Sequence, residues 1–166
     1  MGEGINAWVH IVAATIWVGP QFFLAIAAVP AVRTIEDARV RAQVMRVITR
    51  RFGYLAWGAM AVLVVSGVGN LFEITRDKIP LDELDTVNYG AILTAKIILV
   101  VATIGLTALH AFVLGPRVAA LQESAGDETE IASARRASII VSAVNLLLAL
   151  GILFTAVMLN TTFALE

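Results

Sequence analysis

Four long stretches of the chain are almost free of charged side chains, and charged segments separate them. The stretches cover residues 5–32, 52–72, 87–115 and 137–163, and only Lys96 interrupts the third. Each is longer than the roughly 20 apolar residues that a helix needs to cross the hydrocarbon core of a bilayer. The pattern predicts an all-α integral membrane protein, a single domain in which four spans form an antiparallel four-helix bundle within the lipid bilayer.

The connections between the spans predict the orientation of the chain. Residues 33–51 carry six arginines and residues 116–136 carry three, whereas residues 73–89 carry one arginine and one lysine. Basic residues in short loops stay on the cytoplasmic side. We therefore expect the first and third connections in the cytoplasm, and both termini on the outer side of a membrane, the inner one in a bacterium. Helically spaced valines in residues 33–51 also predict an amphipathic helix there.

The composition excludes several kinds of site. The chain has no cysteine, which excludes disulfides, iron–sulfur clusters, thiolate copper sites and covalently attached c-type haem. The net charge is −1, and no basic stripe lies outside the loops. These features argue against a nucleic-acid partner.

Polar side chains recur along one face of each span. Trp17 and Gln21 follow His10 by seven and eleven residues, and on the second span Ser66 and Asn70 are one turn apart. The polar residues of the third and fourth spans are Lys96, Thr103, Thr107, His110, Ser138, Ser142, Asn145 and Asn160. Because polar groups are costly against lipid, we expect these stripes to face the interior of the bundle. Serine and threonine in spans also serve as packing residues.

The two histidines are the candidate metal ligands, because imidazole binds both copper and haem iron. The predicted topology places His10 in the outer part of the membrane and His110 in the inner part, about 20 Å apart along the membrane normal. One metal therefore cannot take both as ligands within a subunit. The alternative for each is a hydrogen-bonded structural role. For Lys96 the alternatives are an inward-pointing partner of a cofactor and a side chain that snorkels to the outer surface.

Several runs of this sequence have the form of a known membrane family. The run HIVAATIWVG starts the first span as His-x6-Trp-x-Gly, RRFGYLAWGAMAVLVVSGVGNL forms the second, and YGAILTAKIILVVATIGLTALHAF forms the third, followed by GPRVAAL. In this order they resemble the membrane domain of the copper-resistance D (CopD) family and the related four-span HemJ-type protoporphyrinogen oxidases. The resemblance runs from about residue 7 to residue 159.

The resemblance implies two kinds of function. CopD proteins are associated with copper uptake across the inner membrane. HemJ-type proteins bind b-type haem, and their functional histidine, lysine and second histidine match His10, Lys96 and His110.

From the residues and the resemblance together we expect a haem b-binding redox protein, active in electron transfer or in porphyrin or quinol oxidation. His10 would be an axial ligand, with Trp17, Gln21, Lys96, His110 and Asn145 as further cofactor-binding residues. A homodimer and a redox partner in the membrane are the expected associations. Copper uptake and a non-catalytic subunit role are the alternatives.

Overall fold

Every element of the computed structural model, which describes residues 2–77, 88–124 and 127–163, is a helix. The first part of the chain contains α1 (Gly2–Phe23), the π-helix η1 (Leu24–Ala28), α2 (Val29–Arg33) and α3 (Ala38–Asp77). The second contains α4 (Asn88–Leu109), the π-helix η2 (His110–Leu114), α5 (Gly115–Glu123) and α6 (Glu128–Phe163). The predicted all-α class is confirmed.

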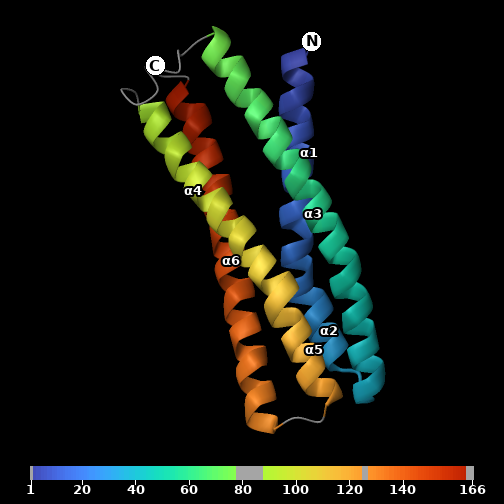
Figure 1. Cartoon of the computed structure of the whole chain (residues 1–166). Coiled ribbons are helices and arrows are strands. Elements are labelled where there is room, and N and C mark those ends of the chain that lie inside the picture. Colours follow the sequence, from blue (N-terminus) through green and yellow to red (C-terminus); the bar gives the residue numbers. More distant parts are fainter. Residues whose placement is uncertain (1, 78–87, 125–126, 164–166) are drawn as a thin grey trace. The chain divides into compact units, whose positions relative to one another are not determined.

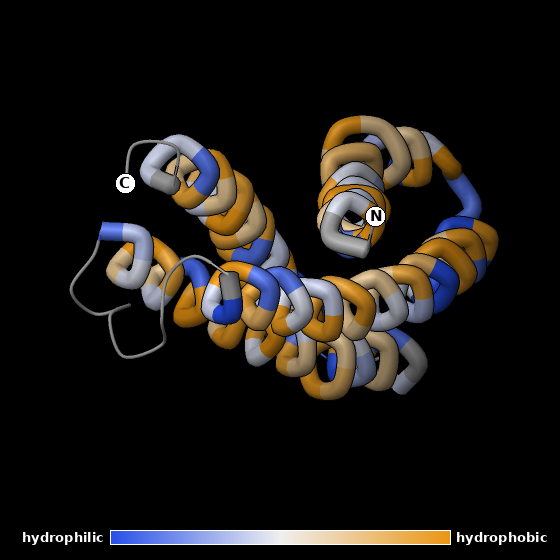
Figure 2. Tube along the Cα trace, turned by 90° about the horizontal axis from the view of Figure 1, so that it is seen from above, coloured by the Kyte–Doolittle hydropathy of each residue, from blue (hydrophilic) through white to orange (hydrophobic). Residues whose placement is uncertain are grey.

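Four helical segments are long and apolar enough to cross a membrane: Gly4–Arg33, Ala38–Arg76, Asn88–Gln122 and Glu128–Thr162. Hydrophobic residues recur on all the long helices, interrupted by hydrophilic stretches (Figure 2). Many large apolar side chains are exposed, including Val65 and Ile26 at 73% each. Exposed apolar surface along helices of this length is typical of helices that face lipid. The four predicted spans and the bilayer environment are confirmed.

The chain divides into two compact units, Met1–Leu81 and Asp82–Glu166. In the first unit α1 packs along α3, and in the second α4 packs along α6 (Figure 1). Early residues of α1 contact late residues of α3, so this hairpin is antiparallel. Helices α4 and α6 are antiparallel too, because Thr107 contacts Asn145 while the later His110 contacts the earlier Ser142. The single domain expected from the sequence stays a prediction.

The amphipathic helix expected in residues 33–51 is the beginning of α3 rather than a separate element. Helix α3 has 40 residues, a length of about 60 Å at 1.5 Å per residue. This is about twice the thickness of a hydrocarbon core. The arginine-rich end of α3 therefore extends beyond the membrane.

A widened π-helical turn precedes a proline in both hairpins. The backbone N–H of Val29 bonds the carbonyl of Leu24, five residues back, and that of Gly115 bonds His110 in the same way. Pro30 and Pro116 follow at the start of α2 and α5. A proline ring collides with the carbonyl four residues earlier in a regular helix, and a wider turn relieves that collision.

The two hairpins share one layout, which the sequence pattern did not reveal. Helices α1 and α4 both have 22 residues, and each is followed by a five-residue π-helix. The same separation of 86 residues joins Gly2 to Asn88, Leu24 to His110 and Pro30 to Pro116. It also joins His10 to Lys96. The imidazole and the ammonium therefore occupy equivalent positions in two copies of one architecture.

The predicted orientation can be tested with single cysteines, because the chain has none of its own. Gly4→Cys and Ala38→Cys lie at opposite ends of the first hairpin, and both positions are exposed. We expect a membrane-impermeant maleimide to label Gly4→Cys in intact cells and Ala38→Cys only after the membrane is opened. Thr129→Cys should behave like Ala38→Cys. Labelling of Ala38→Cys in intact cells would show that the chain has the opposite orientation to the predicted one.

Candidate functional site

Polar side chains from α1 and α3 meet between the two helices of the first hairpin. His10 Nδ1 lies 2.8 Å from Ser66 Oγ. Asn6 Nδ2 donates to the backbone carbonyl of Ser66, at 3.1 Å, and to the side-chain oxygen of Asn70. These four residues form one hydrogen-bonded group, which we call the His10 cluster.

Helical spacing and small residues bring the His10 cluster together. Asn6 and His10 are four residues apart on α1, as are Ser66 and Asn70 on α3, so each pair shares a helix face. Gly69 lets the helices approach, since a Cβ atom there would lie 2.8 Å from Asn6 Nδ2. At Gly67 a Cβ would lie 3.4 Å from His10 Cε1. Asn6 was not among the residues singled out from the sequence, although it precedes His10 by one helical turn on the same face.

The hydrogen bonds of Ser66 assign the tautomer of the neutral His10 imidazole. Ser66 Oγ lies 2.6 Å from the carbonyl oxygen of Val62, which can only accept. The single hydroxyl proton of Ser66 therefore goes to Val62, and Ser66 Oγ must accept from His10 Nδ1–H. The lone pair of the ring is then on Nε2. A hydrogen bond from the other ring nitrogen, as here, orients the histidine ligands of metal sites.

The other two predicted residues of α1 have different surroundings. Trp17 is buried, with 4% of its surface exposed. Gln21 Nε2 donates to the backbone carbonyl of Trp17, 3.2 Å away, so its amide is bonded to its own helix. Among the described contacts, neither side chain hydrogen-bonds to the His10 cluster.

The second hairpin carries a looser polar group. His110, the first residue of η2, lies 3.4 Å from the hydroxyl of Ser142 through Nδ1, and Ser142 is exposed. Thr107 donates to Asn145 Oδ1 at 3.5 Å. Both distances are at the upper limit for a hydrogen bond. The structure thus pairs Thr107 with Asn145 and His110 with Ser142, but more weakly than it joins His10 to Ser66.

Lys96 and Thr103 continue this polar stripe along α4. Lys96 is half-buried, and no described residue forms a hydrogen bond or ion pair with it. Thr103 is 1% exposed, and its Oγ1 has no partner among the described residues. The choice between an inward-pointing and a snorkelling Lys96 stays open.

The His10 cluster offers one metal-binding nitrogen with amide and hydroxyl oxygens around it. Among the described residues no three His, Asp or Glu side chains come together as a metal site. A closed structural metal centre with three or four such ligands is therefore not assembled within the described part of the chain. The ligand roles predicted for His10 and His110 stay predictions.

Comparison with known families identifies the chain. Residues 46–159 match the family model described as copper resistance protein D, and this stretch exceeds half of the chain. The chain therefore belongs to that family. Ser66, Asn70 and Lys96 lie within the matched stretch, whereas His10 lies before it. No characterised protein and no solved structure gives a significant match. The resemblance to CopD is confirmed, and the one to HemJ-type proteins stays a prediction.

Proposed function

We propose that this member of the copper-resistance family binds copper ions within the membrane and passes them across it, with His10 as a ligand. The observation that carries the proposal is the hydrogen bond from His10 Nδ1 to Ser66, which orients the ring and places its metal-binding lone pair on Nε2. Imidazole is a suitable ligand for copper. Copper is the cargo here and not a resident cofactor.

The composition of the His10 cluster supports transfer rather than storage. A conducted ion must bind well enough to enter and weakly enough to leave. One imidazole with neutral oxygen neighbours meets that condition better than a set of three or four strong ligands. Met60, the buried methionine of α3, is six residues from Ser66, about 9 Å along the helix. That separation along α3 argues against Met60 as part of the same site.

The sequence analysis favoured haem b over copper, whereas the comparison with known families favours copper over haem b. The family is named for copper, and neither the comparisons nor the described residues add support for haem b or electron transfer. An absorption spectrum of purified protein supplied with haem separates the two interpretations. A Soret band that disappears in His10→Ala would favour haem, whereas its absence together with copper binding favours the proposal.

The proposal predicts a specific effect of removing the imidazole from the first hairpin. In proteoliposomes that enclose a copper-sensitive dye, His10→Ala should lower the initial rate of copper uptake at least about tenfold, because loss of even a hydrogen-bond partner of a ligating histidine costs about 10- to 100-fold. Thr15→Ala is the matched control on the same helix, because the Thr15 hydroxyl bonds only its own backbone in the described contacts, and it should retain most of the rate. Equal rates for His10→Ala and wild type would refute the role of His10. Unchanged dye signal with wild-type protein, relative to empty liposomes, would refute copper transport.

A further inference from the structure

An open apolar groove runs over one face of the first hairpin. Its volume is about 310 Å³. It lies between α1 and α3, and its middle is widened by Gly58, where a Cβ atom would have no neighbour within 4 Å. The side chains that line it are all apolar or aromatic: Trp8, Val9, Val12, Ala13, Ile16, Tyr54, Leu55, Ala59 and Val62.

Two arginines lie at the end of this groove that is nearer the start of α3. Arg51 precedes Leu55 by four residues and Gly58 by seven, so it is on the same helix face as the groove lining. Arg50 is its neighbour, and both side chains are exposed. Among the described residues neither forms a hydrogen bond or an ion pair.

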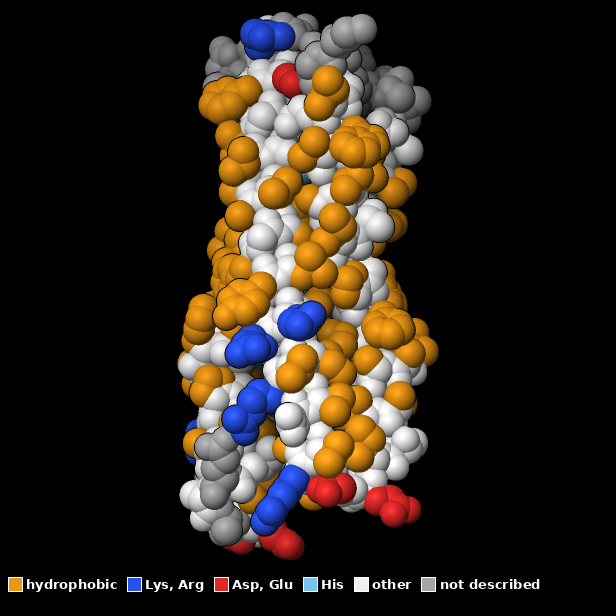
Figure 3. Space-filling model, turned by 90° about the vertical axis from the view of Figure 1, so that its right-hand side faces the viewer, with side chains coloured by type: hydrophobic (Ala, Val, Ile, Leu, Met, Phe, Trp, Pro, Cys, Tyr) orange, Lys and Arg blue, Asp and Glu red, His pale blue; other side chains and the backbone are white. Residues whose placement is uncertain are grey.

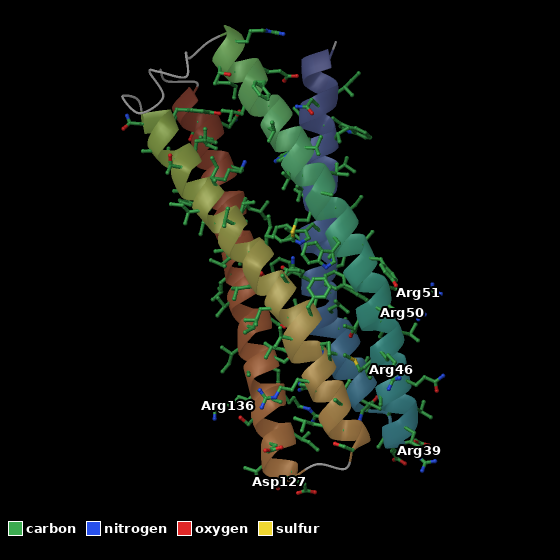
Figure 4. All side chains as sticks on the ribbon, in the orientation of Figure 1. Arg39, Arg46, Arg50, Arg51, Asp127 and Arg136 are labelled. Atoms are coloured by element: carbon green, nitrogen blue, oxygen red, sulfur yellow. The ribbon has the colours of Figure 1, made fainter. Side chains whose placement is uncertain are left out.

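Figure 4 shows Arg50 and Arg51 projecting side by side from α3. On the face of α3 in Figure 3, basic side chains gather on the lower half, below a mostly apolar surface. By helical spacing the apolar groove therefore leads along α3 toward this positively charged end.

We propose that this surface is a binding site for one anionic glycerophospholipid. One acyl chain lies in the groove, and the phosphate binds Arg51 and Arg50. Arginine matches the geometry of phosphate with paired N–H donors, and basic sites beside membrane helices bind anionic headgroups. Tyr54, 74% exposed, follows Arg51 by three residues, at the level where aromatic side chains favour the interface.

The dimensions of the groove fit a lipid of a single leaflet. Arg51 and Val62 are eleven residues apart on α3, about 16 Å at 1.5 Å per residue. Half of a hydrocarbon core is about 15 Å. A headgroup at Arg51 thus places the end of its acyl chain near Val62. The positive-inside distribution makes this the cytoplasmic leaflet. The two positive charges at one end also favour an anionic lipid over a second copy of the chain, which would bring its own arginines.

Lipid retention tests this site with two matched pairs of variants. Protein is incubated with equal amounts of phosphatidylglycerol and phosphatidylcholine in detergent, and the bound lipids are counted by native mass spectrometry. Wild-type protein should retain one phosphatidylglycerol in preference to phosphatidylcholine. Gly58→Leu fills the groove and Arg51→Gln removes a charge, so each should lower this retention about fivefold or more.

The controls use the same helix outside the groove. A Cβ atom at Gly53 would also meet nothing within 4 Å, and Gly53 does not line the groove, so Gly53→Leu should retain lipid like wild type. Arg39→Gln is the charge control. Equal retention of the two lipids, or full retention in Gly58→Leu with its helical content unchanged by circular dichroism, would overturn the proposal. If wild-type protein is a dimer and Gly58→Leu is a monomer, the groove binds a second copy of the chain. That result would also overturn the lipid proposal.

Discussion

Ser66→Ala should weaken copper binding by about 10- to 100-fold, the usual effect of losing the residue that hydrogen-bonds to a ligating histidine. In wild type the hydrogen bond from Nδ1–H to Ser66 Oγ holds the ring of His10 in one orientation. The lone pair on Nε2 then points away from Ser66. Alanine removes the acceptor, so the ring can rotate and exchange its tautomer. The measurement is competition for copper with a chelator of known affinity, on purified protein.

Two further variants make the Ser66 result specific. Ser66→Thr keeps the hydroxyl and should retain most of the affinity. Ser142→Ala removes the corresponding contact of His110 and should leave copper affinity within about twofold, because that contact is long and exposed. Nitrogen NMR of the His10 ring provides a readout that does not depend on copper. Wild type should show a protonated Nδ1, and a protonated Nε2 in wild type would refute the assigned tautomer.

Gly69→Ala should destabilise the first hairpin by about 1–3 kcal/mol, the usual cost of an extra methyl group in a filled interface. The new Cβ would lie 2.8 Å from Asn6 Nδ2 and 3.2 Å from Asn6 Oδ1. The amide must therefore move, and its bonds to Ser66 and Asn70 are lost or lengthened. Reversible unfolding in mixed micelles, followed by circular dichroism, measures the change in the free energy of unfolding.

A double-mutant cycle separates this collision from a general effect of alanine. Asn6→Ala removes the atoms that Gly69→Ala would meet, so the double variant should be more stable than the sum of the two single effects predicts. Gly58→Ala, where a Cβ meets nothing within 4 Å, is the control and should not destabilise the hairpin, because alanine favours a helix over glycine by about 1 kcal/mol. Additive effects of Asn6→Ala and Gly69→Ala would show that the two residues do not meet.

The sequence predicted the four spans because their signal is local. A run of about 20 uncharged residues is sufficient to favour a membrane helix, whatever its neighbours are. The same is true of the arginine-rich connections on which the expected orientation depends. Helical periodicity also placed His10 with Trp17 on one face, and Ser66 with Asn70 on another, because the phase of a helix depends only on residue spacing.

Periodicity does not determine which residue of a second helix lies opposite a given one. The depth at which α1 and α3 are aligned sets the partners of His10, and that alignment depends on how side chains of both helices fit together. Only the tertiary structure therefore pairs His10 with Ser66, brings Asn6 to Asn70, and shows that a Cβ at Gly69 would meet the Asn6 amide.

The repeated layout and the apolar groove were also decided by the tertiary structure. Prolines at 30 and 116 are visible in the sequence, but the π-helical turns before them depend on the backbone hydrogen bonds that the folded helix selects. The groove requires Trp8 and Val12 of α1 beside Gly58 and Val62 of α3. These residues are about 50 positions apart in the chain, so no local pattern specifies their contact, and the packing of the two helices alone brings them together.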